Sequence, residues 1–248
     1  MISSISSRIA AALSVGTLLI GLATVPAGAA PRLDPSRYPG TEQAQQVVVV
    51  TAPRLNTSHG TVRAFERDGD AWRTILDATP ARLGSGGLVA GAQRRQGTGK
   101  TPLGTYGIEW AFGRAADPGT ALRYVQIDRN DAWTYNPKVP STYNVFQTAP
   151  NAWRGYGRYI ERLWGYGTQY DYVLVLDYNL PAGPIVRDAD GIRRSTTPPD
   201  TRRGGGIFLH VTNGKVTAGC IAIPRDDMAK LLRWLDPAKD PVIVIALD

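Results

Sequence analysis

The stretch from Ile207 to Pro224 reads IFLHVTNGKVTAGCIAIP. It contains Cys220, the only cysteine of the chain, and His210, one of its two histidines. Its two ends, Ile207–Val211 and Cys220–Ile223, are short apolar runs typical of buried strands. Because a single cysteine cannot form an internal disulfide, Cys220 is predicted to be a free thiol.

The turn signal Asn213-Gly214 lies between these two runs and favours a two-residue β-hairpin. In that register His210 faces Thr217, whereas Cys220 lies roughly 10 Å farther along and on the opposite face. A regular hairpin therefore keeps the thiol away from the imidazole. A bulge or kink at Gly219 can bring them together, because glycine tolerates the backbone angles that bulges need. If the pair is functional, the ladder has to break near Gly219.

A thiol beside an imidazole is a known arrangement for nucleophilic catalysis. The thiolate is the nucleophile, and a nearby imidazole can take the thiol proton and later give it to the leaving group. Backbone N–H groups at a kinked Gly219-Cys220 can stabilise the oxyanion of a tetrahedral intermediate. The alternative is a cysteine buried in a strand beside a core histidine, since free cysteines are often buried. The residues alone leave both interpretations open.

The remaining sequence predicts a mainly β domain with few helices. Asp226–Leu235 carries apolar residues at the spacing of one helix face and is the clearest predicted helix. Arg187–Gly206 is polar, contains Pro198-Pro199 and the three consecutive glycines Gly204-Gly205-Gly206, and predicts a mobile loop. An Asp68-Gly69 turn predicts a hairpin. The predicted strands are Gln46–Ala52, Gly60–Phe65, Ala71–Leu76, Gly104–Trp110, Leu122–Asp128, Tyr172–Tyr178 and Val242–Ala246.

The segment Asp131–Tyr170 is irregular and unusually aromatic. Aromatic side chains at this density can line a groove. The competing interpretation is a loop region folded over the core, and it is slightly favoured.

The N-terminus predicts an exported protein. Residues 1–29 have the order of a secretory signal, with Arg8, then the apolar run Ile9–Val25, then small residues before a cut after Ala29. The alternative is a membrane anchor, although the run of 17 residues is at the lower edge of what spans a bilayer. Residues 30–45 are predicted to be a linker or disordered lead-in, and residues 46–248 the domain that carries the chemistry.

The charge restricts the classes of partner. The chain has a net charge of +7, and loss of the leader with Arg8 leaves +6. This favours anionic partners, which for an exported protein are wall polymers or lipid headgroups rather than nucleic acid. With two histidines and one cysteine the chain is poorly supplied for a zinc site. A phosphate loop at Thr98–Thr101 is excluded because Arg94 occupies the position of its first glycine.

Two separated motifs resemble the L,D-transpeptidase (YkuD-like) catalytic domains of the bacterial cell wall. The first is Thr101-Pro102-Leu103-Gly104-Thr105-Tyr106, the TPLGTY motif. The second comprises His210 and, after a loop, Thr217, Gly219 and Cys220. The resemblance extends from about Gly60 to the C-terminus.

The chain departs from the family pattern at three points. The family histidine before Gly-Cys is Ala218, and the family arginine two residues after the cysteine is Ala222. The loop between His210 and Thr217 is also shorter than in the typical domain. These departures resemble a divergent branch, in which Arg225 is a candidate substitute for the missing arginine.

The resemblance implies a β-sandwich-like fold with a few short helices. It also implies that Cys220 attacks a peptidoglycan stem peptide between the third residue, a diamino acid, and the terminal D-Ala. His210 acts as base and then acid, Gly219 shapes the site, and Thr217 and Arg225 contact substrate. The amine of another stem takes the acyl group from the thioester. No metal or cofactor is implied, and a monomer in the cell envelope is expected.

Two other functions stay open. An L,D-carboxypeptidase shares the acyl-enzyme and differs only in that water replaces the amine. A cell-wall-binding module that has lost activity is the other alternative. Ala218 and Ala222 favour it, whereas retention of both His210 and Cys220 argues against it.

Overall fold

The computed structural model describes residues 33–248, and the predicted leader 1–29 lies outside the described residues. The strands of the described part are β1 (Gln46–Ala52), β2 (His59–Asp68), β3 (Ala71–Arg82), β4 (Leu88–Ala90), β5 (Thr101–Gly113), β6 (Tyr124–Gln126), β7 (Ala132–Thr134), β8 (Val145–Gln147), β9 (Ile160–Arg162), β10 (Val173–Leu176), β11 (Ala182–Arg187), β12 (Arg193–Thr197), β13 (Phe208–Val211), β14 (Ile221–Ile223) and β15 (Val242–Leu247).

The helices are one α-helix and several short 3₁₀ turns within residues 33–248. They are η1 (Pro35–Arg37), η2 (Gly91–Gln93), η3 (Pro140–Thr142), η4 (Pro150–Ala152), η5 (Arg154–Tyr159), η6 (Leu163–Tyr170), α1 (Arg225–Trp234) and η7 (Pro237–Lys239). The fold is therefore mainly β with few short helices, which confirms the predicted class. None of the helices in this part of the chain has the length and apolar character needed to cross a bilayer.

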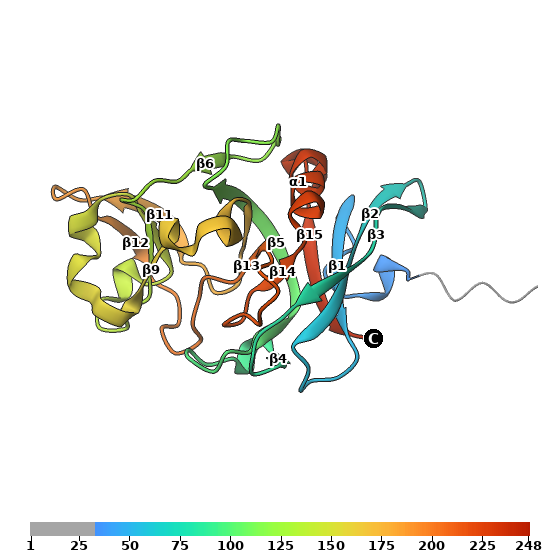
Figure 1. Ribbon diagram of the computed structural model, residues 1–248, viewed down its shortest axis with the longest axis horizontal. Helices are drawn as coiled ribbons and strands as arrows, with labels where there is room; N and C mark the ends of the chain where they lie inside the picture. Colours follow the sequence, from blue (N-terminus) through green and yellow to red (C-terminus); the bar gives the residue numbers. More distant parts are fainter. Residues whose placement is uncertain (1–32) are drawn as a thin grey trace, which may run out of the picture. The chain divides into compact units, whose positions relative to one another are not determined.

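One large sheet organises the domain. Its strands run in the order β10-β13-β14-β3-β2-β1-β15-β5-β4, with β6 paired to β5. The first half of β5 pairs with β15 and its second half with β10, so the path of hydrogen bonds closes on itself. Figure 1 shows β1, β2 and β3 at one end of the domain, with β9, β11 and β12 at the other.

The two largest apolar clusters of the described residues differ in character. One is formed by inward-facing residues of the large sheet together with α1. Met228, Leu231 and Leu232 of this helix and Leu235 directly after it are all buried, as the helix periodicity predicted. The other is aromatic, with Phe112, Trp133, Phe146 and Phe208 in mutual ring contact. Cys220 lies at the edge of this second cluster. The sheet therefore separates an aliphatic core from an aromatic core that reaches the thiol.

Residues 34–45 form part of the same compact unit as the rest of the described chain. Thr41 and Ala44 are buried, and the Oγ1 of Thr105 donates a hydrogen bond to the Pro39 carbonyl at 2.5 Å. The carbonyl of Gln45 accepts from the Arg67 amide at 2.8 Å. Where the sequence predicted a linker, the structure thus has a segment that packs against β5 and β2.

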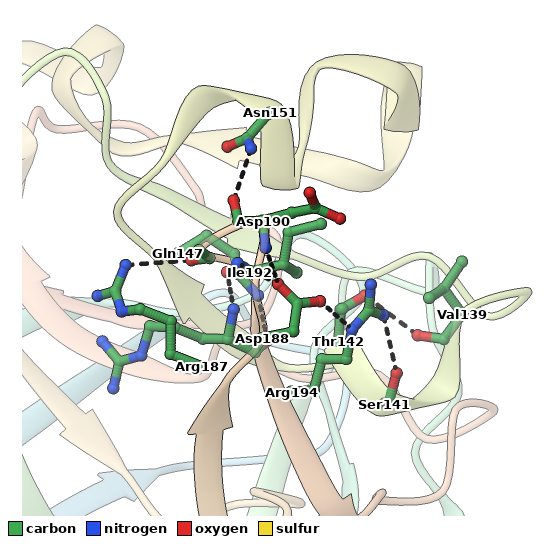
Figure 2. Close-up of polar contacts among 12 residues, drawn as sticks. Val139, Ser141, Thr142, Gln147, Asn151, Arg187, Asp188, Asp190, Ile192 and Arg194 are labelled. Carbon is green, nitrogen blue, oxygen red and sulfur yellow. Dashed lines mark hydrogen bonds and ion pairs between the residues drawn. The ribbon is translucent and has the colours of Figure 1, made fainter.

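The segment predicted as a mobile loop, Arg187–Gly206, contains β12, which forms an exposed hairpin with β11. Figure 2 shows how this hairpin is attached: Arg194 donates to Asp188 at 2.7 Å and to Ser141 at 3.3 Å. The Nε2 of Gln147 donates to the Arg193 carbonyl at 2.7 Å, and its Oε1 accepts from the Arg193 amide at 2.9 Å. The loop prediction was wrong for this part because β-pairing and these side-chain anchors are not visible in local composition.

Candidate active site

The strands that carry His210 and Cys220 run parallel, so the predicted hairpin was wrong. In β13 and β14, His210 pairs with Ala222 and Val211 with Ile223. A type I′ turn needs positive φ at both central residues, and here only Gly214 has it. The chain instead crosses over and returns alongside β13 in the same direction.

This parallel register places the thiol and the imidazole on one face of the sheet. Ala222 shares a face with its partner His210, and Cys220 lies two positions earlier, where side chains return to the same side. His210 and Cys220 both line a single cavity of about 600 Å³. They are 5 % and 9 % exposed, so both are deep in it. The two residues that the sequence singled out are therefore brought together.

The backbone does break at Gly219, as the functional interpretation required. Gly219 has a φ of +136°, a region that side chains disfavour. A Cβ there would lie 2.8 Å from the Lys100 carbonyl and 2.9 Å from Nη2 of Arg94. The Oγ1 of Thr217 closes the turn, since it accepts from the Gly219 amide at 3.1 Å and donates to the Cys220 carbonyl at 2.6 Å. Thr217 thus lines the cavity but uses its hydroxyl to shape the turn.

The thiol of Cys220 donates a hydrogen bond to the Gly206 carbonyl at 3.3 Å. Gly206 is itself fixed by the buried Asn144, whose Oδ1 accepts from the Gly206 amide and from the Trp133 indole, each at 2.7 Å. Asn144 adopts a positive φ of 57° to make these bonds. The sequence analysis did not identify Asn144, because nothing in its local sequence marks a contact with Gly206.

The imidazole of His210 is held by its own strand. Nδ1 lies 2.9 Å from the Val211 carbonyl, a contact that favours the tautomer with the proton on Nδ1 and with Nε2 as the basic nitrogen. The ring packs edge-to-face on Tyr170 with centroids 5.4 Å apart. A backbone carbonyl therefore fixes the tautomer, the role that a carboxylate has in many catalytic triads.

Arg94 directly follows η2, in the Gly-rich loop of residues 84–100, and is a cation near the thiol that the sequence analysis did not identify. Its Nε donates to the Lys100 carbonyl at 2.7 Å and its Nη1 to the Arg203 carbonyl at 2.9 Å. The side chain is 5 % exposed, lines the cavity, and directs Nη2 toward Gly219. A guanidinium held in this way is a preorganised site for a carboxylate.

The two sequence motifs meet through one short chain of hydrogen bonds. Thr101, which opens the TPLGTY motif, is fully buried and accepts from the Gly84 amide at 2.8 Å. Gly84 forms a parallel bridge with Thr217, and the Ser85 amide donates to the Thr217 carbonyl at 2.9 Å. The first motif thereby supports the turn that presents Cys220.

The aromatic segment serves both of the roles considered for it. Trp133 and Tyr143 are core residues, whereas Tyr135, Tyr166 and Tyr170 line the cavity. Tyr135 donates to Glu161 at 2.6 Å, and Tyr170 donates to its other carboxylate oxygen. The carboxylate of β9 therefore lies in the same cavity as the thiol.

Arg225 does not reach the cavity. It begins α1, its Nε lies 3.1 Å from the Asp171 carboxylate, and its guanidinium lies over the Tyr172 ring. Its position makes it a link between α1 and the end of η6. Within residues 33–248, no cluster of three or more histidine, cysteine or acidic side chains has the arrangement of a metal site.

The model of the YkuD family, described as the L,D-transpeptidase catalytic domain, matches residues 46–244. This chain belongs to that family. Among solved structures, it is similar to a lysine-to-alanine mutant of the helical cell shape determining protein Pgp2 from Campylobacter jejuni, with 13% identity and a TM-score of 0.33. The match covers 83% of this chain and 51% of that one, so this chain spans about half the length of that protein. No curated protein matches the sequence.

In this L,D-transpeptidase domain the Cys220 thiol and the His210 imidazole are both uncharged near neutral pH. Burial, and then the Glu161 carboxylate, raise the pKa of the Cys220 thiol to about 12, while the Phe208 backbone and Arg94 act in the opposite direction. Burial lowers the pKa of His210 to about 4, and interactions with the Val211 and Gln169 carbonyls offset only part of this shift by raising the pKa. Between these two values the groups are a thiol and a neutral imidazole, so an attack by the sulfur would require the thiol to lose its proton.

This charge state predicts the pH dependence of thiol modification. We expect the rate of alkylation of Cys220 by iodoacetamide to rise about tenfold per pH unit from pH 7 to pH 10 without levelling, because the thiolate fraction grows tenfold per unit below the pKa. Glutathione under the same conditions levels near its own pKa, and Cys220→Ala gives the background. A plateau below pH 8 would indicate a resting thiolate–imidazolium pair and contradict the prediction.

Proposed function

We propose that the protein is a cysteine acyltransferase of the L,D-transpeptidase type that acts on peptidoglycan stem peptides. The observation that carries the proposal is the shared cavity, in which the only thiol of the chain and a tautomer-fixed imidazole lie on one face of β13 and β14. The family match over residues 46–244 supports the same conclusion.

The reaction begins at Cys220. Sγ attacks the carbonyl carbon between the diamino acid and the terminal D-Ala, and Nε2 of His210 takes the thiol proton as the C–S bond forms. The tetrahedral intermediate collapses when the C–N bond breaks, and the imidazolium returns its proton to the nitrogen of D-Ala. The diamino acid is then held as a thioester on Cys220.

The second half of the reaction transfers the acyl group. The side-chain amine of another stem attacks the thioester carbonyl, a C–N bond forms, and the C–S bond breaks with its electron pair on sulfur. The proton that the amine loses returns to the sulfur through His210. The product is a cross-link between the third residues of two stems, and the thiol is restored.

Backbone and side-chain groups divide the remaining tasks. The Gly219 amide already donates to Thr217, so the Cys220 amide is the oxyanion donor that we propose. Arg94 supplies the positive charge for the carboxylate of the terminal D-Ala, in place of the arginine that Ala222 replaces. Gly219 and Thr217 position the turn, and no role in substrate binding is proposed for Arg225.

The proposed site of action is the cell envelope. The family match and the predicted leader support this location, and the net charge of +6 without the leader suits contact with anionic wall polymers. Peptidoglycan stems are the proposed substrates.

The proposal is tested by the products that the purified protein forms from tetrapeptide muropeptides, analysed by mass spectrometry. We expect release of D-Ala together with dimers joined through their third residues. Trimmed monomers without dimers would assign the chain as an L,D-carboxypeptidase instead. No change in the substrate, with intact binding to peptidoglycan, would assign a wall-binding module.

A further inference from the structure

The cavity contains one carboxylate, and the reaction above does not use it. Glu161, in the middle of β9, is the only acidic residue among the described residues that line the cavity, and its side chain is partly exposed there. The chain has a net charge of +7, so basic residues outnumber acidic ones, yet the cavity lining of the described part includes this acid. It also opposes the nucleophile, because its charge raises the pKa of the Cys220 thiol.

Hydroxyl groups hold this carboxylate in place. Tyr135 donates to Oε2 at 2.6 Å, and Tyr170 donates to Oε1. Tyr166 lies close enough to lower the pKa of the Glu161 carboxyl as well. Phenol hydroxyls donate to both carboxylate oxygens of Glu161, which favours the ionised form. Burial has the larger effect and raises the pKa of the Glu161 carboxyl. A carboxylate that is fixed and partly desolvated binds a cation more strongly than one in water.

The cavity is lined by side chains of opposite charge that come from distant segments of the chain. Arg94 extends from the Gly-rich loop toward the Gly219 turn, whereas Glu161 belongs to the aromatic segment. Arg158, which precedes Glu161 in the same segment, also lines the cavity but donates to the Tyr159 hydroxyl. His210 is uncharged near neutral pH, since burial lowers its pKa to about 4. A ligand that carries a carboxylate at one end and an ammonium at the other fits this polarity.

We propose that Glu161, held by Tyr135, Tyr166 and Tyr170, is the binding group for the primary ammonium of the acyl acceptor. This inference rests on the proposed function and deepens it, because it names the residue that makes the second substrate an amine. Glu161 and Cys220 line the same cavity, so an ammonium bound to Glu161 shares this cavity with a thioester on Sγ.

The chemistry of the step then balances. The bound ammonium gives one proton to the Glu161 carboxylate and becomes a neutral amine, for which the raised pKa of this carboxyl is suited. The nitrogen lone pair forms the C–N bond to the thioester carbon, and the C–S bond breaks. The second proton of the amine passes through His210 to the sulfur, and Glu161 releases its proton to solvent. Cation binding also removes the negative charge that raises the pKa of the thiol.

The test separates the two halves of the reaction in Glu161→Gln. One readout is the burst of D-Ala per enzyme without acceptor, which reports thioester formation. The other is the KM for an acceptor stem with a free side-chain amine, measured from dimer formation. We expect the KM to rise about tenfold or more, as for loss of a hydrogen bond to a charged group, with an unchanged burst. Alkylation of Cys220 by iodoacetamide at pH 8 should become faster, because the neighbouring negative charge is gone.

Three further variants keep the test sharp. Glu109→Gln makes the same change on β5, outside the residues that line the cavity, and should leave both readouts unchanged. Glu161→Asp keeps the charge and should recover part of the acceptor affinity. Tyr166→Phe removes a hydroxyl from a residue that is 42 % exposed, and should raise the KM slightly. A purely structural role of Glu161 would lower the burst and the amount of folded protein together.

The inference is overturned if Glu161→Gln leaves the acceptor KM unchanged. It is also overturned if the burst falls about tenfold while the KM stays constant, since Glu161 would then bind the amine of the donor stem. Failure of the proposed function gives a different result, because the wild-type protein itself would then show no burst and no thioester.

Discussion

Replacing Cys220 with alanine is expected to abolish thioester formation and to reduce the release of D-Ala by at least about a thousandfold. The reason is that Sγ is the atom that forms the covalent bond, and the chain has no second cysteine to replace it. The measurement is the intact mass of the protein after incubation with a tetrapeptide stem. The wild type should gain the mass of the acyl group, and Cys220→Ala should not.

The variant should remain folded, which makes the comparison meaningful. Alanine fits the space of cysteine and removes only the weak bond from Sγ to the Gly206 carbonyl. We therefore expect the free energy of unfolding to change by no more than about 1 kcal/mol. A folded Cys220→Ala protein that still releases D-Ala at the wild-type rate would exclude Cys220 as the nucleophile.

Gly219→Ala is expected to destabilise the domain by at least about 2 kcal/mol and to remove most of the activity. Two physical effects add at this position. The φ of +136° disfavours any side chain, and the new Cβ would lie 2.8 Å from the Lys100 carbonyl and 2.9 Å from Nη2 of Arg94. Relief of these contacts has to move the Cys220 turn or Arg94. Urea unfolding and the rate of thioester formation measure the two consequences.

Gly214→Ala is the matched control for this prediction. Gly214 lies in the same loop and also has a positive φ, +83°, but no atom lies within 4 Å of its added Cβ. It should therefore cost only about 1 kcal/mol of backbone strain and retain activity. If the two variants lose the same stability and the same activity, the close approach at Gly219 is not important for the site.

Much of the local structure could be predicted from the sequence. The strand Gln46–Ala52 has the predicted bounds, the Asp68-Gly69 hairpin joins β2 and β3, and the buried face of α1 is the predicted one. These features succeed because they depend on residues that are near in sequence, through periodicity and turn geometry. The Asn213-Gly214 hairpin failed because tertiary pairing with β13 overrode a turn preference that is worth little by itself.

The candidate site divides in the same way. Cys220, His210 and the break at Gly219 were identified from residue types in one stretch of 18 residues, Ile207–Pro224. Arg94, Asn144 and Glu161 were not identified from the sequence. Each comes from a distant segment whose local sequence indicates only a loop or an irregular aromatic region. Arg225 was a plausible candidate by distance along the chain, and its contact with Asp171 directs it away from the cavity.

By itself, the sequence determined a mainly β domain, its family motifs, and a single thiol with one nearby histidine in the chain. The tertiary structure decided that β14 returns parallel to β13, which puts Cys220 and His210 on one face, and that Arg94 and Glu161 enter the same cavity with opposite charges. The physical reason is that side-chain periodicity is encoded locally. Which distant strands and loops share a cavity depends instead on how the whole sheet closes and buries its two cores.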